Sequence, residues 1–167
     1  TDLLGSYQSK NIKTVTQTVK ELQRKGYKIS EENIKKGLLK VIKNTGLLGR
    51  WQVLNEKPKV VCDTGHNREG LQYVMDQLLN EKFNQLHIVF GVVNDKDLST
   101  ILDLLPKNAT YYFCKPDIPR GMNAYKLKAK LNKYNLKGEA YNSVSEAYKT
   151  AIKQADLNDF IFVGGST

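Results

Sequence analysis

The sequence lacks the short motifs that mark the commonest nucleotide and metal sites. It contains no G-x-x-x-x-G-K-[ST] loop, so it has no phosphate cradle of the P-loop type. It contains no G-x-G-x-x-G motif, which argues against a dinucleotide site. A Gly-x-Ser-x-Gly elbow is missing too, and no His, Cys and carboxylate residues stand at metal-ligand spacing. We therefore expect no metal ligands within this chain.

Cysteine and long apolar runs are also scarce. The two cysteines, Cys62 and Cys114, lie in separate strand-like runs and form no C-x-x-C pair, so reduced, buried thiols are expected rather than a disulfide or metal site. No run is long enough to span a bilayer, and no secretory signal is present. These features predict a cytoplasmic protein with no membrane partner.

The length of 167 residues suits one main domain and a small appendage. The net charge of +9 comes from lysines that are dispersed among acidic residues, and no nucleic-acid module accompanies them. Small polyanionic substrates are therefore expected as partners, and nucleic acid is not. The chain opens on Thr1 and stops at Gly164-Gly165-Ser166-Thr167, directly after a strand-like run, so we expect it to be a fragment of a longer protein.

Residues 1–46 predict a helical hairpin that is separate from the main core. Apolar residues at helical spacing mark a first helix, which ends at Lys25-Gly26. A second helix begins at the N-cap Ser30 and continues through Ile42. Because two amphipathic helices bury little between themselves, their apolar stripes are expected to dock on the second domain or to pair with a second copy of the chain.

Residues 47–167 predict an α/β domain. Two short strands, 51–54 and 59–63, flank a turn and indicate an antiparallel hairpin at a sheet edge. The remaining elements alternate: strands at 86–91, 109–114, 138–141 and 159–163, and helices at 67–79, 98–105, 124–134 and 143–155. This alternation predicts a Rossmann-like, mostly parallel sheet with helices on both faces.

The stretch Asp63-Thr64-Gly65-His66-Asn67 follows a buried strand, at the position where α/β sheets bind ligands. Gly65 lets backbone come close, and Asn67 can cap the following helix. Loops after the other parallel strands should meet this stretch at the same sheet edge. Together they supply a mixed polar set suited to an anionic substrate with an amino group: Asp63, His66, Asp95, Lys96, Asp97, Lys115, Arg120 and Ser166.

Some of these residues have a plainer interpretation. Asp95 and Asp97 could simply cap the helix expected from Leu98. His66 could be a turn histidine that bonds backbone, although its place at a helix start favours a functional role. His87 lies inside an apolar strand and is interpreted as structural.

Five motifs occur in an order that resembles a known family: Leu48-Gly49-Arg50-Trp51-Gln52, Asp63-Thr64-Gly65-His66-Asn67, Gly91-Val92-Val93-Asn94-Asp95-Lys96-Asp97, Pro119-Arg120-Gly121 and Gly164-Gly165-Ser166-Thr167. The whole chain resembles the C-terminal part of folylpolyglutamate synthase/dihydrofolate synthase, in the Mur ligase superfamily. The Asp-x-x-His-Asn element is shared in variant form across Mur ligases, whereas Gly-x-x-x-Asp-Lys-Asp is more typical of the folate branch. Thr64 replaces a frequent small residue, and Arg68 stands where the family often has proline.

The resemblance implies an ATP-dependent carboxylate–amine ligase. Such an enzyme phosphorylates a carboxylate of folate or dihydropteroate, and the amino group of glutamate then attacks the acyl phosphate. ATP and magnesium are the implied cofactors, with the P-loop and magnesium ligands in an upstream ATPase domain of which residues 1–46 would be the end plus a linker. Residues 47–167 would be the C-terminal domain, truncated at its C-terminus.

The resemblance also assigns roles by motif. Asn11, Arg50 and Asp63 resemble ATP contacts, and Asp63 and His66 are the candidate catalytic residues. The candidate glutamate-binding residues are His66, Ser166, Arg120 and Lys96. These roles require Asp63, His66 and Arg50 to converge on one face. Two alternatives remain open: a free-standing module that binds nucleotides or acidic ligands, and a peptidoglycan-type Mur ligase domain, which should lack Asp95-Lys96-Asp97.

Overall fold

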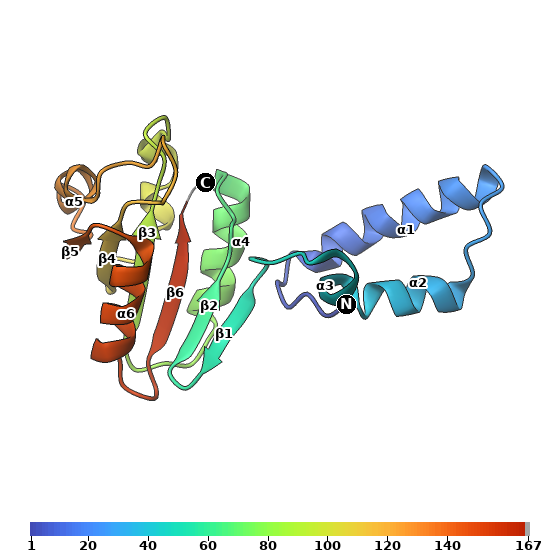
Figure 1. Ribbon diagram of the computed structural model, residues 1–167, viewed down its shortest axis with the longest axis horizontal. Helices are drawn as coiled ribbons and strands as arrows, with labels where there is room; N and C mark the ends of the chain where they lie inside the picture. The colour runs from blue at the N-terminus through green and yellow to red at the C-terminus, as the bar shows by residue number, and fades with distance from the viewer. Residues whose placement is uncertain (166–167) are drawn as a thin grey trace. The chain divides into compact units, whose positions relative to one another are not determined.

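The computed structural model describes residues 1–165 and divides the chain into two compact units, Thr1–Trp51 and Gln52–Thr167 (Figure 1). The first unit contains only helices, and the second contains the whole sheet. The boundary falls a few residues after the position 46/47 that the sequence suggests. Among the described residues, no helix combines the length and apolar character needed to cross a membrane.

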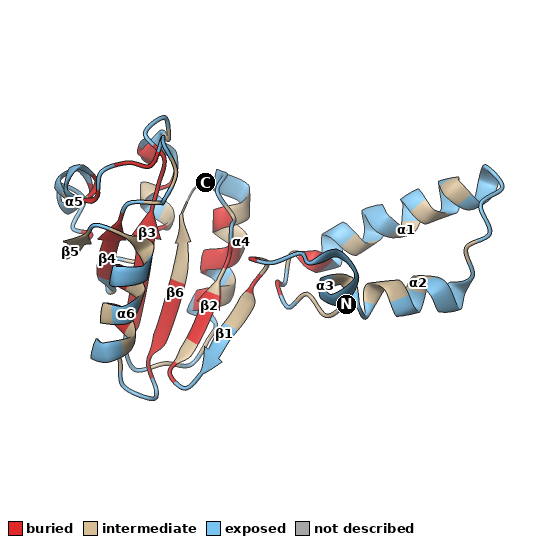
Figure 2. Cartoon of the chain, viewed as in Figure 1, coloured by how far each residue is buried: buried red, intermediate tan, exposed pale blue. Residues whose placement is uncertain are grey.

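The first unit is built from α1 (Gln8–Arg24), α2 (Glu31–Leu38) and α3 (Val41–Thr45). The predicted N-cap of α2 is confirmed, because Ser30 Oγ accepts the N–H of Asn33 at 3.1 Å. Neither α2 nor α3 contains a buried residue, and the only buried residue of α1 is Gln8. Apart from the start of α1, Figure 2 shows these helices in the colours of exposed and half-buried residues. Docking or self-association of their apolar stripes stays a prediction.

The prediction of one continuous helix from Ser30 to Ile42 is wrong. α2 ends at Leu38, and α3 starts again at Val41. The carboxylate of Asp2 accepts the N–H groups of Val41 and Ile42, each at 3.1 Å. A carboxylate at these first N–H groups stabilises a new helix start, and this contact from 39 residues away is invisible to helical periodicity.

The second unit contains a six-stranded sheet in the order β1-β2-β6-β3-β4-β5. Its strands are β1 (Gln52–Glu56), β2 (Lys59–Cys62), β3 (Leu86–Gly91), β4 (Thr110–Cys114), β5 (Gly138–Tyr141) and β6 (Phe160–Gly165). β1 and β2 pair antiparallel, whereas every other pair is parallel. The predicted mostly parallel sheet with an antiparallel hairpin at its edge is confirmed.

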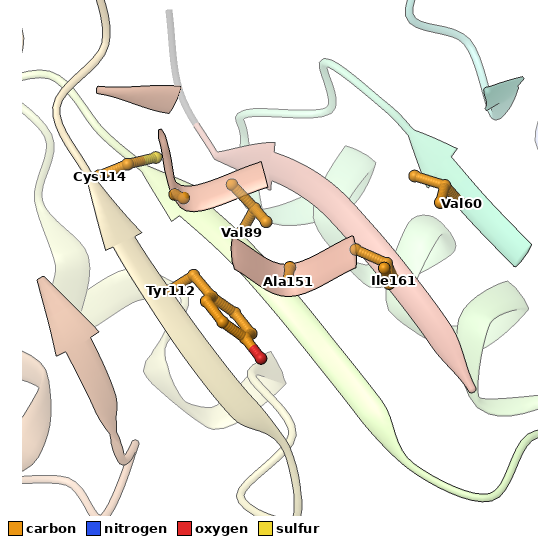
Figure 3. Packing of buried hydrophobic residues seen from close by; sticks show 7 residues of the cluster. Val60, Val89, Tyr112, Cys114, Ala151 and Ile161 are labelled. Carbon is orange, nitrogen blue, oxygen red and sulfur yellow. The ribbon is translucent and has the colours of Figure 1, made fainter. Parts of the chain in front are cut away.

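Helices cover both faces of this sheet, as predicted. α6 (Val144–Gln154) lies in front of the sheet in Figure 1, and α4 (Arg68–Leu79) lies behind it. Figure 3 shows Ala151 of α6 against side chains from β2, β6, β3 and β4 on the same face. The third helix, α5 (Ala124–Asn132), packs beside β4 and β5. The small residues Ala147 and Ala151 let α6 approach one face of the sheet closely. Together with α4 on the other face, α6 buries the central strands on both sides.

The helix expected at 98–105 is absent from the structure. The segment forms two short 3₁₀ turns instead, η1 (Leu98–Thr100) and η2 (Leu102–Leu104). In an α-helix the carbonyl of Thr100 would accept the N–H of Leu104, but that N–H bonds Ile101 O at 3.1 Å. Instead, Arg68 Nη1 donates a hydrogen bond to the Thr100 carbonyl at 2.5 Å. The competing partner comes from a different helix, so apolar spacing alone could not reveal it.

His87 is buried at the start of β3 and is structural, as predicted. Its Nδ1 lies 2.9 Å from the hydroxyl of Tyr112, and its Nε2 lies 3.2 Å from Asp159 Oδ2. The Tyr112 hydroxyl donates in turn to Gln154 Oε1 at 2.7 Å. These contacts tie β3, β4, β6 and the end of α6 together at the sheet edge opposite the candidate site.

Candidate functional site

The loops that follow β2, β3 and β4 meet at the carboxyl edge of the sheet, as the topology predicts. Lys96 Nζ, after β3, donates to the carbonyl of His66, after β2. The N–H of Asn94 donates to the carbonyl of Arg120, after β4, at 2.8 Å. Val93 and Gly121 form an isolated antiparallel bridge between the second and third loops. The three loops therefore form one hydrogen-bonded rim.

Asp63 is the buried carboxylate of this rim, with 3% of its surface exposed. Its Oδ1 accepts the N–H of Gly65 at 2.7 Å, and its own N–H donates to Val163 O on β6 at 3.2 Å. A Cβ added to Gly65 would lie 3.1 Å from this carboxylate oxygen. The glycine thus allows the close approach that the sequence predicts, and the turn holds the Asp63 side chain in a defined position.

His66 lies exposed at the tip of the same turn. Its Nδ1 is 3.1 Å from the carbonyl of Thr64, a contact that orients the ring and leaves Nε2 for an external partner. The next residue is the predicted cap of α4: Asn67 Oδ1 accepts the N–H of Gly70 at 2.8 Å. Asp63 and His66 are therefore fixed at the two ends of one short turn, between a buried strand and a capped helix.

The loop after β3 supplies charges with identifiable partners. Asp97 caps η1, because its Oδ1 accepts both the N–H and the hydroxyl of Ser99, at 3.0 and 2.7 Å. These bonds, the hydroxyl bond above all, hold the pKa of Asp97 below its usual value. Asp95 forms a solvent-exposed ion pair with Arg120 at 3.6 Å. The plainer interpretation of Asp97 as a cap is confirmed by this geometry.

The rim does not present a metal site. Within residues 1–165, no group of three or more His, Cys, Asp or Glu side chains is placed to hold a metal ion. Asp95 faces Arg120, and Asp97 is engaged by Ser99, so neither carboxylate is arranged as a magnesium ligand.

A cavity of about 200 Å³ opens beside the rim, between the ends of β2, β6, β3 and β4. Cys62 and Cys114 both line it, and neither is in a disulfide, as expected. Burial raises the pKa of Cys114 to about 12, while burial and then the charge of Asp63 raise the pKa of Cys62. Raised pKa values favour the protonated thiols at neutral pH; Cys114 is buried as expected, whereas Cys62 is only half-buried.

Glycines at the ends of β3 and β6 shape the same edge. Gly91 and Gly165 are direct partners across the two strands. A Cβ on Gly165, whose φ is 137°, would lie 1.8 Å from the carbonyl oxygen of Gly91. No side chain fits there, so the two strand ends stay in close contact at the floor of the rim.

Three of the residues proposed from the sequence belong to the first unit or lie outside the described residues. Asn11 and Arg50 belong to the first unit: Asn11 Nδ2 donates to Gln8 Oε1 at 2.9 Å, and Arg50 Nη1 donates to Gly49 O at 3.1 Å. Convergence of Arg50 with Asp63 and His66 therefore stays a prediction. Ser166 lies outside the described residues, and Lys115 is exposed at the end of β4.

Arg68 has a role that motif reasoning missed. Its guanidinium forms a bidentate ion pair with Asp103, at 2.7 and 2.6 Å, in addition to its bond to Thr100 O. The bond from Arg68 is the main cause of a lowered pKa at Asp103. Arg68 thus ties the start of α4 to the segment after β3. The resemblance marked position 68 as a departure from the family motif, but only the fold identifies the partner of Arg68.

Known proteins share this architecture. Residues 49–167 match the family described as Mur ligase, glutamate ligase domain. A curated relative from Haloferax volcanii, "Probable bifunctional folylpolyglutamate synthase/dihydropteroate synthase", is 31% identical over 98% of this chain and 19% of its own length. FolC from E. coli, solved in complex with DHPP and ADP, has a TM-score of 0.70 and 28% identity over 87% of this chain and 34% of its own.

A third similar protein is a bifunctional folylpolyglutamate synthase/dihydrofolate synthase solved with Mn, AMPPNP and L-glutamate bound. It has a TM-score of 0.69 and 28% identity over 84% of this chain and 33% of its own. The chain thus spans only a fifth to a third of the length of these three proteins. Over residues 49–167, a range that includes the whole sheet, the chain belongs to the glutamate ligase domain family of the Mur ligases.

Proposed function

We propose that this chain is the C-terminal domain of an ATP-dependent ligase that adds glutamate to folate or dihydropteroate through an acyl phosphate. The observation that carries the proposal is the turn from Asp63 to His66, anchored by Lys96 at the carboxyl edge of a parallel sheet. The names of the similar proteins support the folate branch over a peptidoglycan-type ligase. Residues 1–46 would then be the end of an upstream P-loop ATPase domain plus its linker.

In this proposal the residues of the rim and two residues of the first unit bind different substrates. Asp63, with Asn11 and Arg50, contacts ATP, since a carboxylate suits ribose hydroxyls or bound water and an arginine suits phosphate oxygens. His66, Lys96, Arg120 and Ser166 lie near the incoming glutamate. ATP, with magnesium held by the upstream domain, supplies the activated carboxylate. His66, exposed and oriented by Thr64 O, would position the amino group or accept its proton.

The parent enzyme would act in the cytoplasm, where free thiols such as Cys62 and Cys114 persist. The chain alone should catalyse nothing. It has no P-loop, and within residues 1–165 Asp95 and Asp97 are already engaged, so Arg50 and Asp63 could hold the nucleotide from one side only, without a phosphate cradle or metal ligands for the γ-phosphate. Closure on an upstream domain would also exclude water from the acyl phosphate.

The test is a ligation assay with ATP, glutamate and folate or dihydropteroate, run on the purified chain with and without the separately expressed upstream domain. Ligation only in the mixture is the expected result. Turnover by the chain alone would contradict the proposed division of labour, and no turnover in the mixture or in the intact parent would contradict the ligase proposal. The substrate range would show whether the parent adds the first glutamate to dihydropteroate, extends folates, or does both.

Replacing His66 by alanine should lower kcat of the intact parent about 10- to 100-fold, with the larger part of the loss in the step that uses glutamate. The fold should persist, because Lys96 bonds the backbone carbonyl of residue 66 and not the imidazole. Steady-state kinetics with glutamate varied, together with a thermal melt, check both statements. A variant that melts far below the parent while its remaining folded fraction keeps full turnover would instead make His66 a structural turn residue.

A further inference from the structure

Two contacts join the turn that carries His66 to the loop after β3. In the first, the ammonium group of Lys96 bonds the carbonyl of His66. In the second, Arg68 Nη1 bonds the carbonyl of Thr100 at 2.5 Å, and the guanidinium bonds both carboxylate oxygens of Asp103, at 2.7 and 2.6 Å. Both contacts therefore run between the same two segments of the chain.

The loop after β3 has little regular structure to hold Lys96 in place. Residues 92–109, all of which the structure describes, form two 3₁₀ turns of three residues each and one isolated bridge at Val93. Leu98 and Ile101 are buried and attach the loop to the core. Hydrophobic burial is non-directional, however, and a lysine side chain loses much rotational freedom when its end is held. A directional contact is therefore needed to keep the Lys96 ammonium at one carbonyl.

Arg68 supplies this directional contact. Its planar guanidinium meets the Asp103 carboxylate in a bidentate geometry, which fixes orientation as well as distance. The bond from Arg68 also lowers the pKa of Asp103, so this carboxylate stays ionised at neutral pH. On the other side, Asn67 caps α4 and fixes the backbone between His66 and Arg68. The loop that carries Lys96 is thus held against a capped helix start beside His66.

The side chains of Arg68 and Asp103 are each about half exposed. An ion pair this exposed adds little to the free energy of unfolding, because solvent screens the charges and two side chains lose rotational freedom. The effect of the pair should therefore be local. It should appear in the position of the loop rather than in the melting temperature of the chain.

We propose that Arg68 is a positioning residue: with Asp103 it holds the loop after β3 where Lys96 reaches the His66 carbonyl, and it thereby fixes His66 for the reaction. In this proposal Arg68 itself touches no substrate. The link from Arg68 through Lys96 to His66 concerns this chain alone, whereas its consequence for catalysis rests on the proposed function. The failure of either can therefore be observed separately.

The first measurement is the carbonyl ¹³C resonance of His66 in the purified 167-residue chain, because this resonance reports the hydrogen bond that the carbonyl accepts. Lys96→Met removes the donor and should shift the resonance. Arg68→Gln should shift it in the same direction, although residue 68 does not touch this carbonyl. The control is Lys128→Gln, which breaks the exposed ion pair with Glu139 at 2.6 Å and should leave the resonance unchanged.

The second measurement is a double-mutant cycle on kcat of the intact parent. Arg68→Gln should lower kcat about 3- to 10-fold, and its melting temperature should change by less than about 3 °C. Lys96→Met should lower kcat further, since it removes the contact to His66 outright. If Arg68 acts through Lys96, the double variant should be no slower than Lys96→Met alone. Lys128→Gln should keep the kcat of the parent.

Three results would overturn the proposal. One is an unshifted His66 carbonyl resonance in Arg68→Gln, and the second is an additive loss of kcat in the double variant, which would show independent effects. The third is a shifted resonance with kcat unchanged, which would leave Arg68 a structural residue. If the intact parent ligates no glutamate at all, the proposed function fails, and the resonance still decides whether Arg68 holds Lys96 on His66.

Discussion

Replacing Asp159 by alanine is expected to lower the free energy of unfolding by about 3–5 kcal/mol, the usual cost of removing one partner of a buried charged contact. The residue is buried and immediately precedes β6. Its Oδ1 accepts the N–H of Gln85 at 3.0 Å, and its Oδ2 accepts the N–H of Asp156 at 2.8 Å and faces His87 Nε2 at 3.2 Å. With alanine at this position, the two backbone N–H groups and the His87 ring would lose this hydrogen-bond partner in a largely buried environment.

The stability contributed by Asp159 should also depend on pH. Burial alone would raise the pKa of Asp159, but hydrogen bonds from Asp156, His87 and Gln85 outweigh it, so the pKa in the folded state lies below its usual value. A lowered folded pKa means that the contribution is fully present above the unfolded pKa, about 3.9, and is lost as the pH falls through the folded value. The stability difference between parent and variant should therefore shrink below about pH 4.

Urea unfolding followed by circular dichroism, at several pH values, measures this difference. Asp156→Ala is the matched control: Asp156 is exposed and contributes its backbone N–H, so its loss should cost less than about 0.5 kcal/mol. A difference of less than 1 kcal/mol between Asp159→Ala and the parent at pH 7 would show that the contacts around His87 do not hold the strands together.

The elements whose signals are local were predicted closely from the sequence. β3 has the predicted bounds, because it is a continuous apolar run that is buried along its whole length, and the short strand β5 has them too. The start of α6 was also predicted, since Ser143 Oγ accepts the N–H of Glu146 at 3.1 Å. Here the Glu146 side chain reaches back to the N–H of Asn142, one residue earlier than an ideal capping box.

The errors have a common physical cause, which is a distant side chain that competes for helical backbone groups. Asp2 starts α3 from 39 residues away, and Arg68 takes a carbonyl of the 98–105 segment from 32 residues away. Apolar spacing describes which face of a segment is buried, and it carries no information on such partners. Both errors therefore fall where the tertiary structure decides the backbone hydrogen bonds.

For the candidate site, the strand order predicted that the loops after the parallel strands lie at one edge of the sheet. It did not predict which residues of these loops contact each other. Parallel strands place Asp63, Lys96 and Arg120 at one edge, and this follows from strand order alone. The bond from Lys96 to the carbonyl of His66 depends on side-chain reach and could not be derived from spacing. The roles of Asn11 and Arg50 depend on a different unit, so they rest on the resemblance.

Replacing Asp63 by asparagine should have the largest effect on activity, a loss of at least about 100-fold in kcat/KM of the intact parent. Asparagine has nearly the same shape, and its carbonyl oxygen can still accept the N–H of Gly65. The turn and the strand end should therefore keep their conformation, while the negative charge is removed from a buried position. Steady-state kinetics for ATP and glutamate, together with a thermal melt, separate these two effects.

The control is Asp76→Asn, which makes the same chemical change on the exposed side of α4 and should leave kinetics and melting unchanged. The way in which the loss of activity in Asp63→Asn divides between kcat and the two KM values is informative. If Asp63 contacts ATP, as proposed, KM for ATP rises as kcat falls, whereas KM for glutamate changes little. Full activity with an unchanged melting temperature would show that the charge of Asp63 is needed for neither catalysis nor stability. That result would rule Asp63 out as a site residue.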